Sequence, residues 1–350
     1  MSHWFEAPLA EIDLTAQQQA EARQGVLTKP PGSLGQLEQL AIKFAGWQGT
    51  VIPELIANKT AIAIFAADHG VAAEGVSAFP QIVTVEMVKN FARGGAAICV
   101  LAGHHSAALH IINAGTANSV EGVEGVVDCA IAKGTANFAN QPAMTDSQCL
   151  DALAIGQHVI NHVIADDTRL FIGGEMGIAN TTSASAVCCA LLNIKAVELA
   201  GAGTGLDERS IMHKAEVIAA ALQTHSVTTE PLDVLRKVGG FEIAALAGAY
   251  IAAAQKGIPS LVDGFIATSS ALLACRLQPE LKPWLLFSHQ SAEKGHQRVL
   301  AALEANPLLS LGMRLGEGSG AAMCLPIIDS ALALHANMAT FEEAEVQTEI

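Results

Sequence analysis

The chain has 350 residues, of which 51% are hydrophobic and 15% charged, so it is long enough and apolar enough to bury a large core. Its formal charge of −15 excludes a broad nucleic-acid surface, which needs clustered Lys and Arg, but it does not exclude one bound phosphate. No basic n-region precedes an apolar run at the N-terminus, and the Ala-rich stretch 242–254 is too short to cross a bilayer. The seven cysteines form no C-x-x-C pair, which favours free thiols in a reducing compartment, so we expect a cytoplasmic protein.

Residues 1–58 are predicted to form helices outside the main sheet. One helix is expected over residues 13–28. A second follows the Pro30–Pro31–Gly32 turn, with Ser33 as its N-cap. The apolar side chains of this second helix fall on one stripe, which consists of Leu34, Leu37, Leu40, Ala41 and Phe44.

Short apolar runs with the composition of buried parallel strands follow, at 61–67, 108–115, 168–177, 194–205, 259–265 and 285–289. Stretches of helical periodicity separate them, at 84–103, 146–164, 181–192, 207–223 and 242–256. Strands that alternate with helices predict an α/β fold with a doubly wound, mainly parallel sheet. We expect residues 59–310 to form this large domain. Residues 311–350, with a helix over 325–345, are expected to complete a smaller helical lobe with residues 1–58.

Polar and glycine-rich motifs follow five of the predicted strands, namely ADHG, GGEMG, GAGTG, VDG and SHQS. In a doubly wound sheet, ligands bind beyond the carboxyl ends of the strands. The motifs therefore predict one binding site at a single edge of the sheet.

The GGEMGIANTTSASA segment, residues 173–186, offers a carboxylate and a helix start together. Glu175 stands at a strand end, where it can hold a ribose hydroxyl. The polar side chains of residues 180–183 can cap the next helix, whose free N–H groups can bind an anion. An ordinary βα turn with an N-cap is the commoner meaning of such a stretch, and Glu175 is what favours the functional interpretation.

The GAGTGLD segment, residues 201–207, superficially suggests a dinucleotide site. It lacks the G-x-G-x-x-G spacing and lies well past the first βα turn, so it gives a nicotinamide-dependent dehydrogenase little support. Its three glycines still indicate close approach of the backbone to a ligand. Lys214, on the following predicted helix, is a candidate phosphate partner.

Metal and hydrolase chemistry have weaker support. His158 and His162 share one helix face, but the spacing supplies no third ligand, so surface or packing histidines are the commoner explanation. The SHQSAEKGH segment, residues 288–296, has no G-x-S-x-G elbow. Ser291 is therefore interpreted as a hydrogen-bond donor at a helix start, or simply as its cap.

Glu317 lies inside the glycine-rich stretch LGMRLGEGSGAAM, residues 311–323. Gly316 and Gly318 leave room for a flat ligand close to the backbone. The apolar neighbours Met313 and Leu315 are expected to raise the carboxyl pKa, as a general base near neutral pH requires. A Glu in the first turn of a helix over 318–335, favoured by the helix dipole, explains the residue equally well.

Eight uncommon segments run between Lys29 and Ala322: KPPGSLGQLE, ADHGV, RGGAAICVLA, GGEMGIANTT, KVGGFEIAALAG, VDGFI, SHQSAEKG and RLGEGSGAA. In this order they resemble the nicotinate-nucleotide–dimethylbenzimidazole phosphoribosyltransferase family. That family makes the α-ribazole phosphate of the cobalamin lower ligand. The resemblance covers most of the chain and is far more specific than a single glycine motif.

The resemblance implies transfer of the 5-phosphoribosyl group from nicotinate mononucleotide to a benzimidazole nitrogen, with inversion at the anomeric carbon. Nicotinate leaves readily because the bound pyridinium is already positively charged, whereas the incoming base must lose its N–H proton. The general base of the family's LGEG motif corresponds to Glu317. The resemblance implies no metal or dissociable cofactor. It implies a Rossmann-like domain with a small helical lobe in a homodimer, with the two small-molecule substrates as partners.

The resemblance also assigns substrate-binding residues. Gly177, Lys214 and Ser291 match positions that contact the phosphate, and Glu175 matches a position near the ribose. The aromatic base is expected in a pocket formed by Phe79, Pro80, Met87, Met176 and Leu315.

Two departures from common family patterns affect the expected substrate. Ala202 stands where many members have Arg, which softens the electrostatics near the phosphate. Phe79 and Met87 replace polar residues of some members, so adenine or a phenol stay alternatives to 5,6-dimethylbenzimidazole. A dehydrogenase and a non-enzymatic nucleotide sensor with the same fold are the other hypotheses. Release of nicotinate from a mixture of the two substrates separates catalysis from sensing.

Overall fold

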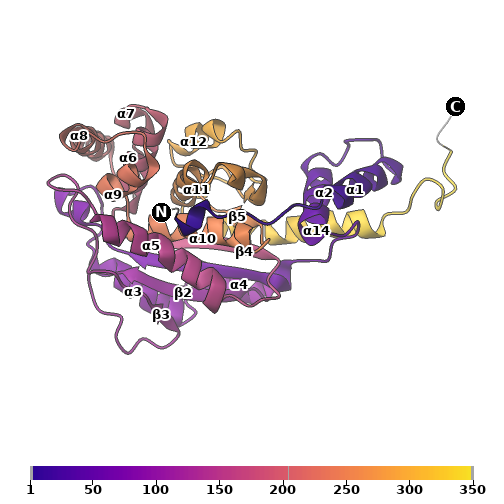
Figure 1. The fold of residues 1–350 in the computed structure, drawn as a ribbon, viewed down its shortest axis with the longest axis horizontal. Helices are drawn as coiled ribbons and strands as arrows, with labels where there is room; N and C mark the ends of the chain where they lie inside the picture. The colour runs from indigo at the N-terminus through magenta and orange to yellow at the C-terminus, as the bar shows by residue number, and fades with distance from the viewer. Residues whose placement is uncertain (1–2, 204, 348–350) are drawn as a thin grey trace.

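The centre of the molecule is a six-stranded parallel sheet in the order β3-β2-β1-β4-β5-β6 (Figure 1). The computed structural model describes residues 3–203 and 205–347. Its strands are β1 (Thr60–Ala67), β2 (Ala108–Gly115), β3 (Val126–Asp128), β4 (Leu170–Met176), β5 (Ser260–Val262) and β6 (Leu285–Phe287). The parallel sheet with helices on both faces confirms the predicted α/β fold class.

The α-helices lie mainly between the strands in the chain. They are α1 (Leu14–Val26), α2 (Gln36–Gln48), α3 (Ile82–Ala92), α4 (Ala97–His105), α5 (Asp146–His158), α6 (Asn180–Leu192), α7 (Ala196–Leu199), α8 (Glu208–Thr224), α9 (Pro231–Val238), α10 (Phe241–Gln255), α11 (Phe265–Leu277), α12 (His296–Ala302), α13 (Ser319–Ala322) and α14 (Leu325–Asn337).

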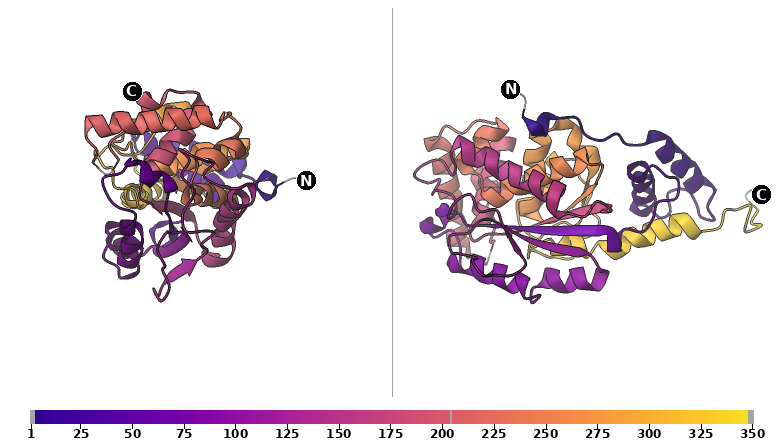
Figure 2. Two further views of the ribbon diagram at one scale, coloured as in Figure 1. Left: turned by 90° about the vertical axis from the view of Figure 1, so that its left-hand side faces the viewer. Right: turned by 60° about the horizontal axis from the view of Figure 1, so that its bottom comes forward.

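Strand β1 is apolar after its first residue, Thr60, because helices cover both of its faces. All eight of its residues are buried. Phe65 points to the face covered by α5, α6, α10 and α11, whereas Ile62 and Ile64 point to the face covered by α3, α4, α13 and α14 (Figures 1 and 2). Because successive side chains of a strand point to opposite faces, this one short run contributes residues to two apolar clusters.

The chain order reverses beside β1. From β1 the chain moves outward to β2 and β3, and then returns to place β4 on the other side of β1. Such a reversal leaves a crevice at the carboxyl ends of the two central strands, where doubly wound proteins bind their ligands. The end of β4 carries Glu175 and Met176, paired in register with Phe65 and Ala66.

Helices α1, α2 and α14 form a lobe at one end of the molecule, so segments from both halves of the chain meet there (Figure 2). Arg23 donates hydrogen bonds from its guanidinium to the carbonyl oxygens of His335 and Ala336, at 2.8 and 2.9 Å. The Lys29–Glu38 ion pair, 2.9 Å long, closes the turn between α1 and α2. The 3-10 turn Trp4–Glu6 instead packs on the large domain, with Phe5 in its core. The proposed boundaries at residues 58 and 310 stay predictions.

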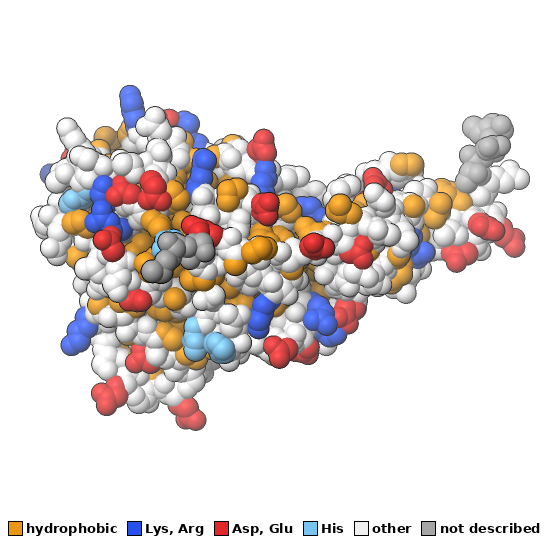
Figure 3. Space-filling view, viewed as in Figure 1, with side chains coloured by type: hydrophobic (Ala, Val, Ile, Leu, Met, Phe, Trp, Pro, Cys, Tyr) orange, Lys and Arg blue, Asp and Glu red, His pale blue; other side chains and the backbone are white. Residues whose placement is uncertain are grey.

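The distribution of surface charge and the burial of one apolar helix test two expectations from composition, namely no broad basic surface and no membrane span. On the face shown in Figure 3, acidic and basic side chains of the described residues are interspersed, without a broad basic patch. The helical segment Ser319–Asn337 matches a membrane span by length and composition alone. Since 56% of its most apolar window is buried, a core helix explains it.

Several local predictions were wrong. The run 194–205 is not a strand, because residues 196–199 form helix α7 and residues 200–203 belong to neither a helix nor a strand. Ser33 does not cap α2, which begins at Gln36 after Gly35. Helix α14 ends at Asn337 instead of continuing to residue 345. The sequence analysis also missed β3, a strand of three residues at the sheet edge.

Candidate active site

A cavity of about 490 Å³ opens at the carboxyl ends of the strands. It is lined by residues of the β4–α6 turn, the segments that follow β5 and β6, and the stretch that leads into α13. The lining residues are Phe79, Glu175, Met176, Gly177, Ile178, Asn180, Thr181, Gly203, Gly264, Phe265, Ile266, His289, Ser291, Glu293, Arg314, Leu315 and Gly316. Six of the predicted site residues are among them, which are Phe79, Glu175, Met176, Gly177, Ser291 and Leu315. Pro80, Met87, Lys214 and Glu317 are not.

Glu175 is a buried carboxyl in the wall of this cavity. The Asn180 side-chain amide donates a hydrogen bond to its Oε2. Its Oε1 lies against Gly316, where a Cβ atom would collide with it. Burial, together with the nearby carboxyls of Glu242 and Asp263, raises the pKa of Glu175 to about 8. Glu175 therefore holds a proton near neutral pH and can donate a hydrogen bond as well as accept one.

Residues 315–318 are here called the LGEG turn, and the last three of them have a left-handed conformation. Gly316, Glu317 and Gly318 have φ values of 86°, 64° and 82°. A non-glycine residue at positive φ is uncommon and persists only where its surroundings hold it. Those surroundings are the backbone of β4 on one side and a buried carboxylate on the other, described next.

Asp263, directly after β5, anchors the LGEG turn. Its two carboxylate oxygens accept hydrogen bonds from the backbone N–H groups of Gly318 (3.1 Å) and Ala321 (2.9 Å). On the other side, a Cβ atom on Gly174 of β4 would lie 2.5 Å from the Glu317 carbonyl oxygen. The turn thus rests directly on the sheet backbone, which only glycine permits at position 174.

The side chain of Glu317 faces α4 rather than solvent. Glu317 is 5% exposed, and its Oε2 is buried without a hydrogen-bond partner among the described residues. Burial raises the pKa of the Glu317 carboxyl, although the backbone N–H of Ile98 at the start of α4 opposes the shift. The direction is the one expected for a general base. The predicted alternative, a Glu in the first turn of a helix, is wrong, because Glu317 precedes α13 and its cap Gly318.

Lys214 of α8 lies behind the cavity wall. Its ammonium donates hydrogen bonds to Thr181 Oγ1 (3.1 Å) and to the Gly201 carbonyl oxygen (3.3 Å). Burial lowers the pKa of Lys214 to about 8, against the opposing charge of Glu293. Thr181 and Gly203 line the cavity, so the Thr181 side chain lies between the Lys214 ammonium and the cavity.

Ser291 is fixed by a neutral histidine. The Ser291 backbone N–H donates to His296 Nδ1 at 2.8 Å. Burial lowers the pKa of His296 to about 3, so its ring is neutral and Nε2 carries the proton. That nitrogen lies 2.9 Å from Thr268 Oγ1 and donates to it. The Ser291 side chain does not cap α12, which begins five residues later at His296.

The predicted aromatic pocket divides into an exposed rim and a buried wall. Phe79 and Leu315 line the cavity and are 52% and 57% exposed, so an aromatic ligand can cover them. Met176 and Met87 pack on the α3–α4 side of the sheet, the side to which the LGEG turn also belongs. Pro80 is exposed just before α3.

The sequence analysis missed a fully buried pair beneath Gly177. His69 Nε2 lies 2.6 Å from Glu242 Oε1, and both side chains are 0% exposed. A Cβ atom on Gly177 would lie 3.3 Å from the Glu242 carboxyl and 3.4 Å from the His69 ring. ADHGV and KVGGFEIAALAG, quoted above for the resemblance, contain these residues. Neither motif revealed that the fold brings residues 69 and 242 together. Arg314 and Glu293, which line the cavity, were also given no role.

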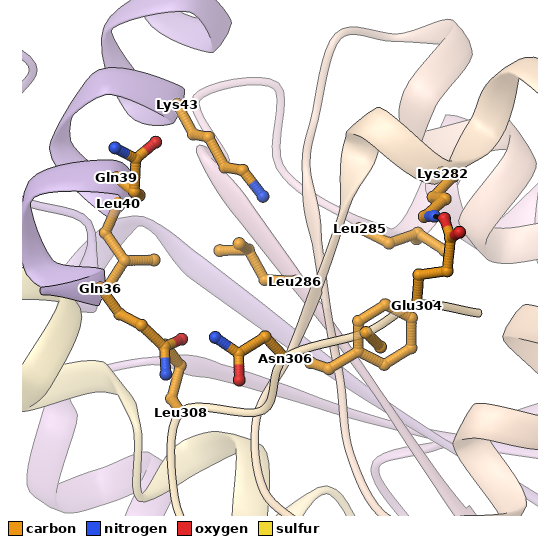
Figure 4. A pocket seen from close by; sticks show the side chains of 12 residues that line it. Gln36, Gln39, Leu40, Lys43, Lys282, Leu285, Leu286, Glu304, Asn306 and Leu308 are labelled. Carbon is orange, nitrogen blue, oxygen red and sulfur yellow. Dashed lines mark hydrogen bonds and ion pairs between the residues drawn. The ribbon is translucent and has the colours of Figure 1, made fainter. Parts of the chain in front are cut away.

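A second cavity, of about 300 Å³, lies between α2 and the outer edge of β6. Figure 4 shows Lys43 of α2 and Asn306 pointing into it, and the Lys282–Glu304 ion pair at its side. None of the predicted site residues lines this cavity. Among residues 3–203 and 205–347, no three His, Cys, Asp or Glu side chains are grouped as a metal site requires.

A buried carboxyl with a pKa of about 8, that of Glu175, lines a cavity at the switch point of a parallel sheet, and the buried carboxyl of Glu317 lies on the adjoining LGEG turn. This arrangement defines an α/β enzyme that acts on a small polar molecule.

Comparison with known proteins specifies the class further. The model of a family described as phosphoribosyltransferase matches residues 9–346, so the chain belongs to that family and is a pentosyltransferase. A relative from Xanthomonas oryzae pv. oryzae, named nicotinate-nucleotide–dimethylbenzimidazole phosphoribosyltransferase, is 57% identical over 98% of both chains. A Pseudomonas putida relative of the same name is 54% identical over 98% of this chain and 97% of its own length. The crystal structure of CobT from Thermus thermophilus matches with a TM-score of 0.91 and 41% identity, over 96% of this chain and 100% of that one.

Proposed function

We propose that the chain transfers the 5-phosphoribosyl group of nicotinate mononucleotide to 5,6-dimethylbenzimidazole or a related base. The products are α-ribazole 5′-phosphate, for the lower ligand of cobalamin, and nicotinate. The observation that carries this proposal is Glu317, a buried carboxyl with a raised pKa and an unpartnered oxygen on the strained LGEG turn. The two bacterial relatives named for this reaction, both more than 50% identical over nearly the whole chain, support the choice of substrates.

The nucleotide is proposed to bind in the 490 Å³ cavity. Gly177, Lys214 and Ser291 would surround the phosphate, because they combine a backbone without a side chain, a positive charge behind the cavity wall and a hydroxyl. Glu175 would hold a ribose hydroxyl, since its carboxyl lies in the cavity wall. The proposed placement has the anomeric carbon facing the LGEG turn, whose residues Leu315 and Gly316 line the cavity.

The incoming base is proposed to lie against Met176 and Met87 under Phe79, Pro80 and Leu315. These side chains are apolar, and two of them are more than half exposed, so stacking on an aromatic base covers surface now open to water. Phe79 and Met87 carry no polar group to select a hydroxyl or an amine. We therefore expect 5,6-dimethylbenzimidazole to be preferred to adenine.

In the proposed step, one benzimidazole nitrogen attacks the anomeric carbon while the bond to the nicotinate nitrogen breaks. The electron pair of that bond returns to the pyridinium ring and neutralises it. The proton on the other benzimidazole nitrogen passes to Glu317, which must be ionised beforehand. A raised pKa makes the Glu317 carboxylate a stronger base for this proton.

Replacing Glu317 by Gln tests the proposal directly. Gln keeps the volume and cannot take the proton, so turnover should fall by roughly 10²-fold or more, while nucleotide binding is kept. Nicotinate release from mixed substrates measures the first quantity, and calorimetry with nicotinate mononucleotide measures the second. Glu198→Gln, which removes one carboxylate from the surface pair with Arg298, is the control. Near-normal turnover of the Glu317 variant would overturn the assignment of the base, and no nicotinate release by the unaltered chain would overturn the function.

We also propose that the protein acts as a homodimer in the cytoplasm, with only small molecules as partners. The family resemblance supports this assembly. Sedimentation at micromolar concentration should give twice the chain mass of 36.2 kDa, and a monomer at that concentration would contradict it.

A further inference from the structure

Glu293 lines the cavity and is not used in the proposed reaction. One of its carboxylate oxygens lies against Gly201, where a Cβ atom would collide with it, and the nearby backbone N–H of Gly203 favours the charged form of the carboxyl. Gly203 has a φ of 52°, which lies in the left-handed region that glycine adopts readily. The Glu293 carboxylate thus lies directly against the backbone of this glycine loop.

Two cations face the same loop from other elements. Lys214 of α8 donates to the Gly201 carbonyl oxygen at 3.3 Å, and Arg314, just before the LGEG turn, donates to the Gly203 carbonyl oxygen at 3.3 Å. Neither cation has a carboxylate within 4.0 Å among the described residues, although both act electrostatically on Glu293. Their positive charge is therefore only partly compensated.

A loop N–H, a lysine, an arginine and the nearby hydroxyls of Thr181 and Ser291 form the donor set of a phosphate site. The Glu293 backbone N–H donates a hydrogen bond to Ser291 Oγ at 3.3 Å. Glu293 therefore lies next to one of the groups of this donor set. A phosphate placed among these donors would meet the Glu293 carboxylate, and two like charges cannot share the donors without a cost in binding.

We propose that Glu293 is an internal stand-in for the substrate phosphate. Its carboxylate lies against the glycine loop, where Lys214 and Arg314 attract it, and the 5′-phosphate displaces it on binding. Glu293 thereby weakens binding of the phosphorylated substrate and product and favours product release. This inference rests on the proposed function for the identity of the phosphate compound.

The test compares Glu293→Gln with the unaltered chain by titration calorimetry. Nicotinate mononucleotide should bind the variant roughly tenfold more tightly, because one like charge is gone. Nicotinate riboside, which lacks the phosphate, should bind both equally. Glu216→Gln is the matched control, since Glu216 is an exposed carboxylate on the helix of Lys214, and it should leave both affinities unchanged. Unfolding curves establish that each variant is folded.

The outcomes separate this inference from the proposed function. Equal or weaker binding of the mononucleotide to the Glu293 variant overturns the inference while leaving the function intact. A gain shared by the riboside also overturns it, because the effect would then not involve the phosphate. If the unaltered chain binds no mononucleotide, inorganic phosphate is the probe. If phosphate then raises the unfolding temperature of the Glu293 variant more than that of the unaltered chain, the result supports the phosphate site but not the nucleotide as its ligand. An equal rise in the two proteins overturns both the phosphate site and the nucleotide as its ligand.

Discussion

Lys214 carries an ammonium group that the fold buries to 1% exposure. The folded pKa of about 8 against an ordinary 10.5 corresponds to about 3 kcal/mol of destabilisation at neutral pH. A Met of similar length avoids this cost but loses the two hydrogen bonds of the ammonium. Lys214→Met should therefore raise the free energy of unfolding at pH 7 by roughly 1–3 kcal/mol and abolish tight binding of the mononucleotide.

The sign of the pH dependence follows from the lowered pKa of Lys214. Between about pH 8 and 10.5 the unfolded lysine keeps a proton that the folded lysine has lost, so the unaltered chain gains stability as pH rises. The Met variant lacks this gain. The stability difference, measured by urea unfolding, should therefore be largest below pH 8 and narrow toward pH 10. A difference independent of pH would contradict burial of the charge as its cause.

Gly174 tests the support of the LGEG turn. In Gly174→Ala the new methyl would lie 2.5 Å from the Glu317 carbonyl oxygen, so the turn must move. We expect a loss of about 1–3 kcal/mol in unfolding free energy, as for other overpacked sites. Nicotinate release should fall further than this loss of stability explains. The control is Gly25→Ala in α1, where a Cβ meets nothing within 4 Å and unfolding free energy should rise slightly. Normal turnover of the Gly174 variant would show that the turn tolerates displacement.

For individual residues, the sequence suggests a functional role only where a local sequence pattern sets the residue apart. Glu317 was recognisable because glycines and apolar residues surround it, and Glu175 because it ends an apolar run. His69, Glu242 and Glu293 were not, since their partners are distant in the chain and only the folded sheet brings them together.

Among the elements, the segment that follows β1 is joined to α10 by the buried His69–Glu242 pair. Removing one partner of such a pair leaves a polar group without compensation in the core. Glu242→Leu should therefore lower the unfolding free energy by roughly 3–5 kcal/mol, measured by urea unfolding. The double variant His69→Leu/Glu242→Leu should recover most of that loss, because both polar groups are gone. A loss in the double variant equal to the sum of the losses in the two single variants would show that the two side chains do not depend on each other.

The errors at the element scale have a physical cause. The run 194–205 is apolar because Leu199 and Ala200 pack in the core as part of a helix and a loop, and a short apolar run does not distinguish these from a strand. Strand β3 was missed because Val126–Asp128 lies at the sheet edge with no fully buried residue. The long central strands β1, β2 and β4, with their continuous apolar runs, were predicted within two residues.

For the whole molecule, the helical lobe and the large domain share one core. Phe44 and Leu40 of α2 belong to the same apolar cluster as Ile62 and Ile64 of β1. Trp47 of the lobe stacks on Trp284 of the large domain, with ring centroids 6.4 Å apart. The sequence predicted a separate lobe from its position outside the strand series. It could not predict that the two parts share a core, because the apolar residues of α2 and β1 have the same sequence pattern in one shared core as in two separate cores.

A shared core predicts that lobe and sheet unfold together. Phe44 is 0% exposed, so Phe44→Ala should cost roughly 3–5 kcal/mol, and the whole molecule should bear that cost rather than α1 and α2 alone. Tryptophan fluorescence reports the Trp47–Trp284 contact between lobe and domain, whereas far-ultraviolet circular dichroism reports all helices. In urea both signals should shift to the same lower midpoint, with nicotinate release lost in parallel. Val100→Ala, at a side chain that is 65% exposed, should leave the midpoint within experimental error.

A fluorescence change at lower urea concentration than the dichroism change would instead show that the lobe unfolds by itself. The LGEG turn would then depend on the large domain alone.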